Sequence, residues 1–553
     1  TKPIELAIVA NPSEESSSEP FGAVSLALRR WEPDALAPLG FGGSGRVRTR
    51  GNCLAAPALG PAPARLICGE QLEQARKLEP YLTRGLPLEA LGPAPVQFVL
   101  RPAPLQGIWR ELKPGLESAI SGLLAQDDGG DAADGAAVRA IAAGLFAETD
   151  AWARSVENVV AELVPTPEAG FELAVTIRTR DPQPWLMAAN ERVTAAPAAL
   201  PSLFDSLPPQ ATSAGFMLGF APRDMRVLTD ATQTLLRSEL LAAFDAALVA
   251  MLPQFDVAKE LLQELVTSPC VAAREMVWAS VPYETASAKP ASVAEARLRS
   301  WLGHGLFAAP REAGCADLVR RNLNRFVTSK ELREALKSYM PDLAVRKVAA
   351  PRRLGKATAF ELDVSTRMLE FLEFKSRAEA AWPLQLFAEK PELGGPVMLV
   401  PSPAPEDART KLTLIVHQAE HGDWIGFSAD AEQLARVMEQ LGRQAAVRGP
   451  GLARLRQPHT LNGEYFDLTD VERQLASDPR LRALIEAIGG PAVLRERIVS
   501  TTRVYREQGT LNTRVSYFLS PLTVAAVKRL SALDAERLEA IGLTPDGAAN
   551  ESP

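Results

Sequence analysis

The sequence contains few of the residues that catalysis and metal binding use most often. Among 553 residues there are four histidines and four cysteines, and aromatic residues make up 6%. No run of 18 or more apolar residues occurs, so the sequence predicts no transmembrane segment. The formal net charge is -7, so the protein does not have the excess of positive charge that attracts proteins to nucleic acid. We therefore expect neither a transmembrane helix nor a nucleic-acid partner.

What the chain does have is the composition of a large globular protein. Hydrophobic residues make up 46% and charged residues 23%, and the length is too great for one core. We expect an α+β fold of two related halves that meet near residue 270, each an antiparallel-rich sheet packed against amphipathic helices. Composition and periodicity divide the chain into an N-terminal α/β module, a helix-rich α+β module, a helical segment that opens the second half, and a β-rich α+β module. These are residues 1–104, 105–269, 270–344 and 345–553.

Helical periodicity is strongest between residues 105 and 164, where apolar residues recur at i, i+3, i+4 and i+7. Residues 293–306 and 315–340 are also predicted to be helical. The second half then becomes rich in short strands, and residues 497–520 read as a hairpin around a Glu-Gln-Gly-Thr turn.

Four cysteines allow three disulfide pairings, among which the sequence alone does not choose. Local pairs, Cys53 with Cys68 and Cys270 with Cys315, would each close a loop within one half. Such loops stabilise a fold by roughly 3–4 kcal/mol each. The alternative is four buried free thiols. An even number of cysteines in sequence-adjacent pairs favours disulfides and an oxidising compartment.

Two short motifs match known patterns but lie in unsuitable contexts. His417, Glu420 and His421 match the HxxEH pattern of zinc peptidases, which requires both imidazoles on one helix face. They follow a predicted strand and precede a turn, and residues four apart on a strand are about 13 Å apart. They are weak metal candidates, so we expect no metal and no cofactor. The GFGGSG segment at residues 40–45 matches a dinucleotide fingerprint, but it precedes a predicted strand and not a helix.

The other candidates are weaker still. His304 and His459 have no cysteine or serine beside them in a recognisable catalytic frame, and no GxSxG motif occurs. We therefore predict no catalytic residue. The densest positive patch could contact anionic headgroups, glycans or an acidic partner, although a solvated strand face and turn is the simpler interpretation. It consists of Arg346, Lys347, Arg352, Arg353 and Lys356.

Two segments resemble known proteins. APALGPAPARLICG, with the helix and PYLTRGLP after it, and DWIGFSADAEQLA resemble blocks of large uncharacterised exported bacterial proteins built from tandem α+β modules. Many of these are periplasmic proteins or lipoproteins. The resemblance implies an envelope location and a link between Cys53 and Cys68, and it supplies no catalytic residues. This chain has no N-terminal cysteine for lipid attachment.

The start of the chain agrees with export. It opens TKPIELAIVA, without an initiator Met or a signal-peptide pattern, as a mature chain does after signal removal, and a trimmed chain would look the same. We expect a protein of the periplasm or cell surface.

Three functions remain open. The first is a non-enzymatic envelope protein that binds other envelope proteins as a scaffold component. The second is a carrier of lipid or another hydrophobic ligand, with residues 345–430 and 497–520 joined in a half-barrel. The third is a metal-dependent hydrolase that uses His417, Glu420 and His421.

Overall fold

The computed structural model describes residues 4–9, 21–27, 36–57, 64–85, 94–125, 132–220, 268–284, 303–365, 409–467 and 479–533, with short gaps inside some ranges. Backbone contacts divide the chain into two compact units. The first contains residues 1–122, 145–184 and 506–516, and the second contains residues 123–144, 185–505 and 517–553. None of the described helices is long and apolar enough to cross a membrane.

The N-terminal region forms a small antiparallel sheet with strand order β1-β2-β5-β4-β3. Helix α2 (Leu72–Pro80) packs on it through Ala75 and Leu78, which join Leu54 and Ile67 in a small core. Cys53 and Cys68 lie directly opposite each other on β4 and β5 and form a disulfide. The strands are β1 (Ile4–Val9), β2 (Phe21–Ala27), β3 (Arg48–Arg50), β4 (Cys53–Ala56) and β5 (Arg65–Gly69).

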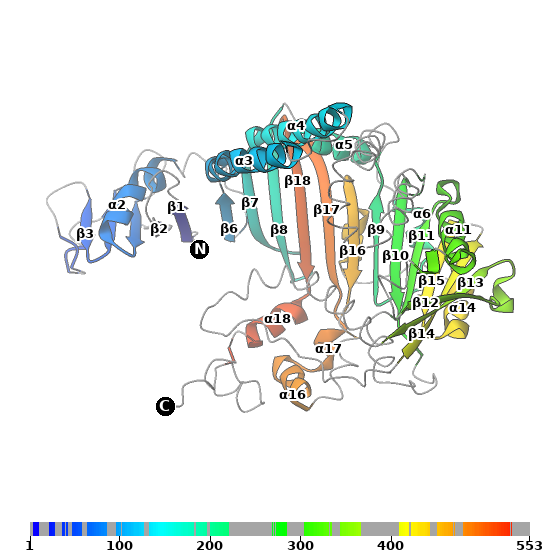
Figure 1. The fold of residues 1–553 in the computed structure, drawn as a ribbon. Helices are drawn as coiled ribbons and strands as arrows, with labels where there is room; N and C mark the ends of the chain where they lie inside the picture. The colour runs from blue at the N-terminus through cyan, green and yellow to red at the C-terminus, as the bar shows by residue number, and fades with distance from the viewer. Residues whose placement is uncertain are drawn as a thin grey trace, which may run out of the picture. The chain divides into compact units, whose positions relative to one another are not determined.

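A second antiparallel sheet has thirteen strands, in the order β12-β13-β14-β15-β11-β10-β9-β16-β17-β18-β8-β7-β6 (Figure 1). The strands are β6 (Val96–Leu100), β7 (Val156–Pro165), β8 (Phe171–Thr179), β9 (Ser213–Leu218), β10 (Glu275–Val281), β11 (His304–Ala309), β12 (Leu343–Val348), β13 (Thr358–Ser365), β14 (Arg409–Ala419), β15 (Gly422–Ser428), β16 (Thr460–Phe466), β17 (Ile498–Glu507) and β18 (Thr510–Leu519).

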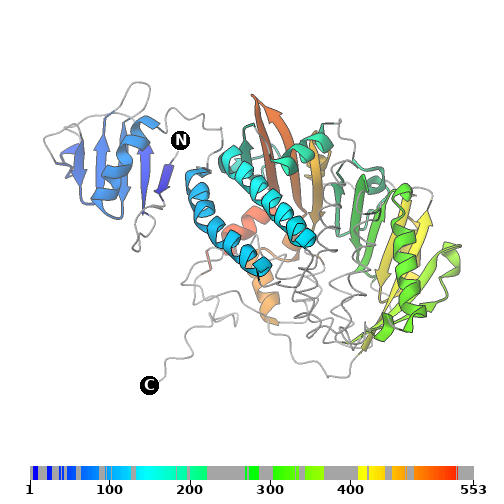
Figure 2. The same ribbon diagram turned by 45° about the horizontal axis from the view of Figure 1, so that its top comes forward.

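The described part of the chain also contains helices. In the first unit, most of α3 and the end of α4 run side by side (Figure 2). The main helices are α3 (Pro102–Ala125), α4 (Ala132–Ser155), α5 (Trp185–Thr194), α11 (Cys315–Thr328), α14 (Ala431–Glu439), α16 (Pro479–Ile488) and α18 (Pro521–Leu530). Short turns of helix are the π-helical η1 (Tyr81–Gly85), α6 (Ser202–Asp205), η3 (Arg311–Ala313), η4 (Arg352–Leu354), η5 (Leu452–Arg456) and α17 (Pro491–Leu494).

The core of the second unit lies between β9–β11, β14–β17 and the helices packed on them. Phe204 of α6 meets Phe216 and Tyr465 edge-on, and Leu434 and Met438 of α14 pack over Gly426 of β15. Glycine is required where rings cross strands: a Cβ on Gly305 would lie 2.1 Å from the Phe427 ring, and one on Gly215 would lie 2.4 Å from the Trp278 ring. Each ring packs directly on the glycine opposite it, and these contacts favour the observed register of β9 with β10 and of β11 with β15.

The fold confirms the α+β class, the antiparallel sheets and the hairpin in residues 497–520, which is β17 and β18. It gives no evidence of two related halves, because β9 lies between β10 and β16, which belong to the predicted second half. The predicted joining of 345–430 with 497–520 is wrong, since β11, β10, β9 and β16 separate β15 from β17. The division into four modules stays a prediction.

Two predicted helices are partly strands. The helical stretch up to residue 164 ends at Ser155, and β7 begins at Val156. Four valines in β7 favour extended backbone, and its nine-residue partner β8 supplies the hydrogen bonds. His304 likewise begins strand β11 and does not end a helix, because β10 and β15 pair with it on both sides.

The two disulfides should contribute to the free energy of unfolding. Both local pairs form, with sequence separations of 15 and 45 residues. We expect the double variant C270A/C315A to lose about 3–4 kcal/mol of unfolding free energy, because the open loop gains conformational freedom in the unfolded chain. Denaturant unfolding would measure this loss. The matched variant C53A/C68A should lower the stability of the N-terminal sheet instead. Equal stability of both variants and wild type would contradict the expectation.

Candidate functional site

The most developed polar cluster in the described part of the chain surrounds His304. This residue begins β11, Ser428 ends β15, and Gln433 lies in the first turn of α14. Tyr283 follows β10, and its ring lies 4.2 Å from the imidazole, centroid to centroid. His304 and Ser428 are only 1% and 2% exposed. Two regions that are more than 100 residues apart in the sequence, 283–304 and 428–433, thus meet at one buried point.

Hydrogen bonds connect these side chains in a continuous chain. His304 Nδ1 is 2.8 Å from Ser428 Oγ, which is also 2.8 Å from the Tyr283 hydroxyl. On the other side of the ring, His304 Nε2 is 3.3 Å from Gln433 Oε1. The Gln433 amide nitrogen donates to Asp430 Oδ2 at 3.0 Å.

Donors and acceptors determine where each proton lies. Asp430 is a carboxylate that accepts at the start of α14, so Gln433 must turn its amide nitrogen to Asp430 and its carbonyl oxygen to His304. An oxygen only accepts, so the imidazole carries its proton on Nε2. Nδ1 is then an acceptor, and the Ser428 hydroxyl donates to it.

Both lone pairs of Ser428 Oγ accept hydrogen bonds in this arrangement. Its hydroxyl proton goes to His304, and it accepts the backbone N–H of Asp430 at 3.0 Å and the hydroxyl proton of Tyr283. Tyr283 in turn accepts the backbone N–H of Ala429 at 3.0 Å. A serine that donates to an imidazole is also a feature of nucleophilic serine sites, but here each polar atom already has an internal partner. The cluster therefore holds β10, β11, β15 and α14 together.

Burial sets the charge of the imidazole. Desolvation lowers the pKa of His304 to about 4, although Gln433, Asp430 and Glu284 oppose that change. The ring is therefore neutral at pH 7, which agrees with the single proton that the hydrogen bonds require.

A second buried group lies at the opposite end of β15. Asp423 is buried and accepts the backbone N–H of Ala316 at 3.2 Å, in the first turn of α11. Burial raises the pKa of this carboxyl. The neighbouring residue Cys315 forms the disulfide with Cys270, so a hydrogen bond and a covalent bond both hold the start of α11.

An ion-pair cluster occupies one face of the sheet in the first unit. The Arg514 guanidinium contacts Glu162 and Glu172, each at 3.0 Å, and Gln97 donates to Glu162 at 2.9 Å. All four side chains lie on the same face, on β18, β7, β8 and β6. The opposite face of these strands carries Phe98, Ala161 and Val175 in one cross-strand row.

The residues predicted as weak metal ligands are described only in part. His417 lies half-buried on β14 opposite Trp424 of β15, and burial lowers its pKa. Glu420 and His421 lie outside the described residues. Within the described ranges, no three His, Cys, Asp or Glu side chains gather as metal ligands would.

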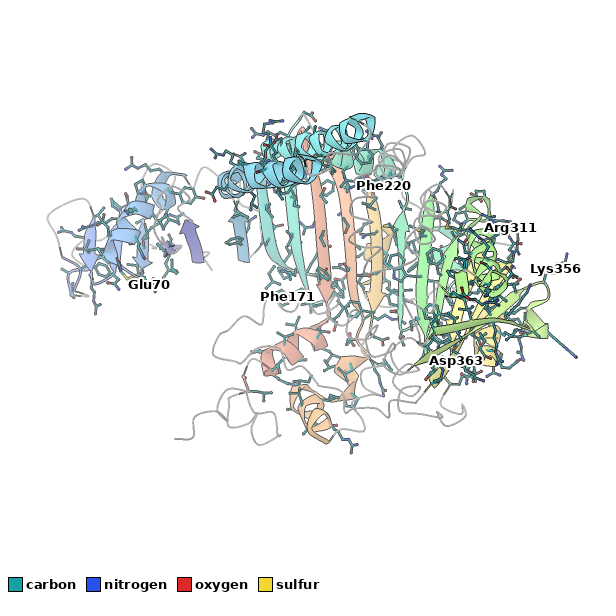
Figure 3. All side chains as sticks on the ribbon, viewed as in Figure 1. Glu70, Phe171, Phe220, Arg311, Lys356 and Asp363 are labelled. Carbon is teal, nitrogen blue, oxygen red and sulfur yellow. A yellow bond between two sulfur atoms is a disulfide. The ribbon has the colours of Figure 1, made fainter. Side chains whose placement is uncertain are left out.

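The predicted basic patch is partly neutralised by carboxylates. Arg346 on β12 lies 2.6 Å from Glu361, and Arg353 lies 3.4 Å from Glu432 and 3.7 Å from Glu439. Lys347 and Arg352 are exposed, as is Lys356, which is labelled in Figure 3 and lies in the turn between η4 and β13. A role of this patch in anion contact stays a prediction.

Sequence reasoning missed the His304 cluster. Its members are spread over 150 residues and share no spacing pattern, and only the pairing of β11 with β10 and β15 brings them together. Comparison with protein-family models, with curated proteins and with solved structures finds no match for the chain.

The hydrogen-bond chain predicts the effect of losing its central hydroxyl. We expect Ser428→Ala to cost about 1–3 kcal/mol of unfolding free energy, because His304 and Tyr283 each lose a buried partner. Denaturant unfolding would measure it. Ser118→Ala, at an exposed position on α3, should change stability by less than about 0.5 kcal/mol. If both variants matched wild type, the cluster would not hold the fold.

The lowered pKa of His304 predicts a pH dependence. Its folded value of about 4 lies below the unfolded value of 6.5, so as pH falls the unfolded chain takes up the proton first. The stability that comes from the neutral ring is complete above pH 6.5 and is lost as pH falls towards 4. The full loss is roughly 3 kcal/mol. Between pH 7 and pH 4.5, the unfolding free energy of His304→Gln should fall by less than that of wild type. An equal fall in both proteins would contradict a lowered pKa of His304.

Proposed function

We propose that the protein is a non-enzymatic component of a bacterial envelope assembly, and that it binds other proteins through an exposed apolar face of helices α3 and α4. Two disulfides support an oxidising compartment such as the periplasm. The resemblance of two segments to exported modular proteins supports the same location. The observation that carries the proposal is the row of exposed leucines on these helices.

Specific contacts hold α3 and α4 together in an antiparallel pair. Trp109 Nε1 donates to Asp150 at 2.6 Å, and Lys113 lies 2.7 Å from the same carboxylate. Gln106 donates to the backbone oxygen of Ala153 at 3.0 Å, and the Trp109 ring lies 6.1 Å from the Phe146 ring. Residues 106, 109 and 113 of α3 therefore face residues 146, 150 and 153 of α4.

These contacts define where the neighbouring side chains lie. Leu112 and Leu116 follow Trp109 by three and seven residues, and Leu145 precedes Phe146 by one. With 3.6 residues per turn and antiparallel helices, all three leucines fall on the same side of the pair. They are between 46% and 65% exposed. The other side carries the exposed charged residues Arg110, Glu117 and Arg154.

Such a face suits one kind of partner. Leucines one helical turn apart are the anchors with which amphipathic helices enter an apolar groove or pack on another helix. Burial of the part of each leucine that is still exposed would contribute roughly 1 kcal/mol. A protein partner with an apolar groove or helix stripe fits this face better than a charged ligand does.

Site-specific photo-crosslinking in intact cells would test the proposal. A photoreactive residue at position 116 or 145 should give adducts of one defined mass, and mass spectrometry would identify the partner. The same residue at position 110 or 154, on the charged side, is the matched control and should give no such adduct. Leu116→Asp should reduce recovery of the identified partner at least tenfold.

Other outcomes would overturn the proposal. Equal adducts on both sides would indicate random collision, and the absence of adducts on both sides would remove the apolar face as a docking surface. Adducts that carry lipid mass would favour the carrier function instead.

A further inference from the structure

The thirteen-stranded sheet ends in two strands whose outer edges have no described neighbour, β12 and β6. An open edge presents unpaired backbone N–H and C=O groups that can pair with another chain. Soluble proteins usually protect such edges with charged residues, proline, bulges or covering segments. The two edges of this sheet differ in that respect.

The β12 edge carries protective charges. Arg346 and Lys347 are adjacent on this six-residue strand and both are exposed. A second β12 placed beside the first would bring like charges near one another on each face of the sheet, which disfavours pairing.

The β6 strand itself contains neither a charged residue nor a proline. Its sequence is Val-Gln-Phe-Val-Leu, and all five residues pair with β7 on the inner side. The side chain of its central residue, Phe98, is 45% exposed. An uncharged edge with an exposed aromatic ring is the type of edge that forms a strand-to-strand interface.

We propose that β6 pairs antiparallel with β6 of a second copy of this chain, about a two-fold axis at Phe98. The register then places Phe98 opposite Phe98, Gln97 opposite Val99, and Val96 opposite Leu100. Every pair is uncharged and the interface is self-complementary, as two-fold symmetry requires. This inference does not rest on the α3–α4 docking face.

The faces of the sheet also match across this interface. Phe98, Ala161 and Val175 form one cross-strand row on the face opposite Arg514. In the dimer this row continues through the second Phe98 to the second Ala161 and Val175. Aromatic pairs opposite each other stabilise antiparallel strands, so the row favours a second copy over an unrelated extended peptide.

Sedimentation velocity of the full chain between 1 and 100 μM (roughly the range in which weak dimers dissociate) would test the pairing. Wild type should sediment with the mass of two chains at the upper concentrations. Phe98→Lys should weaken dimerisation at least tenfold and give the mass of one chain. The matched variant Ala344→Lys, on exposed β12, should remain a dimer. Wild type that stays a single chain at 100 μM, or a Phe98→Lys variant that still dimerises, would overturn the proposal.

A cysteine at position 98 tests the register. The four native cysteines are all in disulfides, so Phe98→Cys introduces the only free thiol. Mild oxidation should link two chains through residue 98, whereas Ala344→Cys should stay unlinked, and equal linking of both would contradict the register. The Phe98→Lys variant should still give the photo-crosslinked adduct from residue 116. The test of the dimer and the test of partner binding through α3 and α4 can therefore fail separately.

Discussion

Backbone pairing between antiparallel strands is the constraint on which this structure depends. A strand must satisfy its N–H and C=O groups on both sides or stand at an edge. In this protein the pairing places β9 between β10 and β16, and β11 between β10 and β15. The His304 cluster and the rings over Gly215 and Gly305 follow from those neighbours. The same rule of pairing leaves the outer edges of β12 and β6 without a described neighbour.

Pairing of distant strands also brings polar groups into the interior, where each needs a partner. His304 meets this requirement by losing its charge and using both ring nitrogens. Arg514 meets it by keeping its charge between Glu162 and Glu172. Two solutions to the same desolvation cost therefore occur in one protein, and the choice depends on whether carboxylates lie within reach.

The two proposed surfaces consist of groups that have no such partner among the described residues. The leucines of α3 and α4 and the Phe98 edge of β6 are apolar or unpaired groups that the described chain leaves open. Exposed apolar surface of this kind often marks an interaction site. The proposed protein partner would cover the leucines of α3 and α4, and the proposed second copy would pair with β6, and neither proposal depends on the other.

Local patterns in the sequence determined a good part of this protein. The alternation and turn in residues 497–520 predicted β17 and β18, and the even number of cysteines in sequence-adjacent pairs favoured disulfides but left three pairings open. These features depend on residues close in the chain, where periodicity and loop length act directly. Tertiary structure decided the rest. Residues 156–164, predicted to be helical, form a strand because β6 and β8 pair with them on both sides. His304 became part of a cluster because β10, β15 and α14 meet around it. No pattern of spacing records such meetings, since they depend on which distant strands share hydrogen bonds.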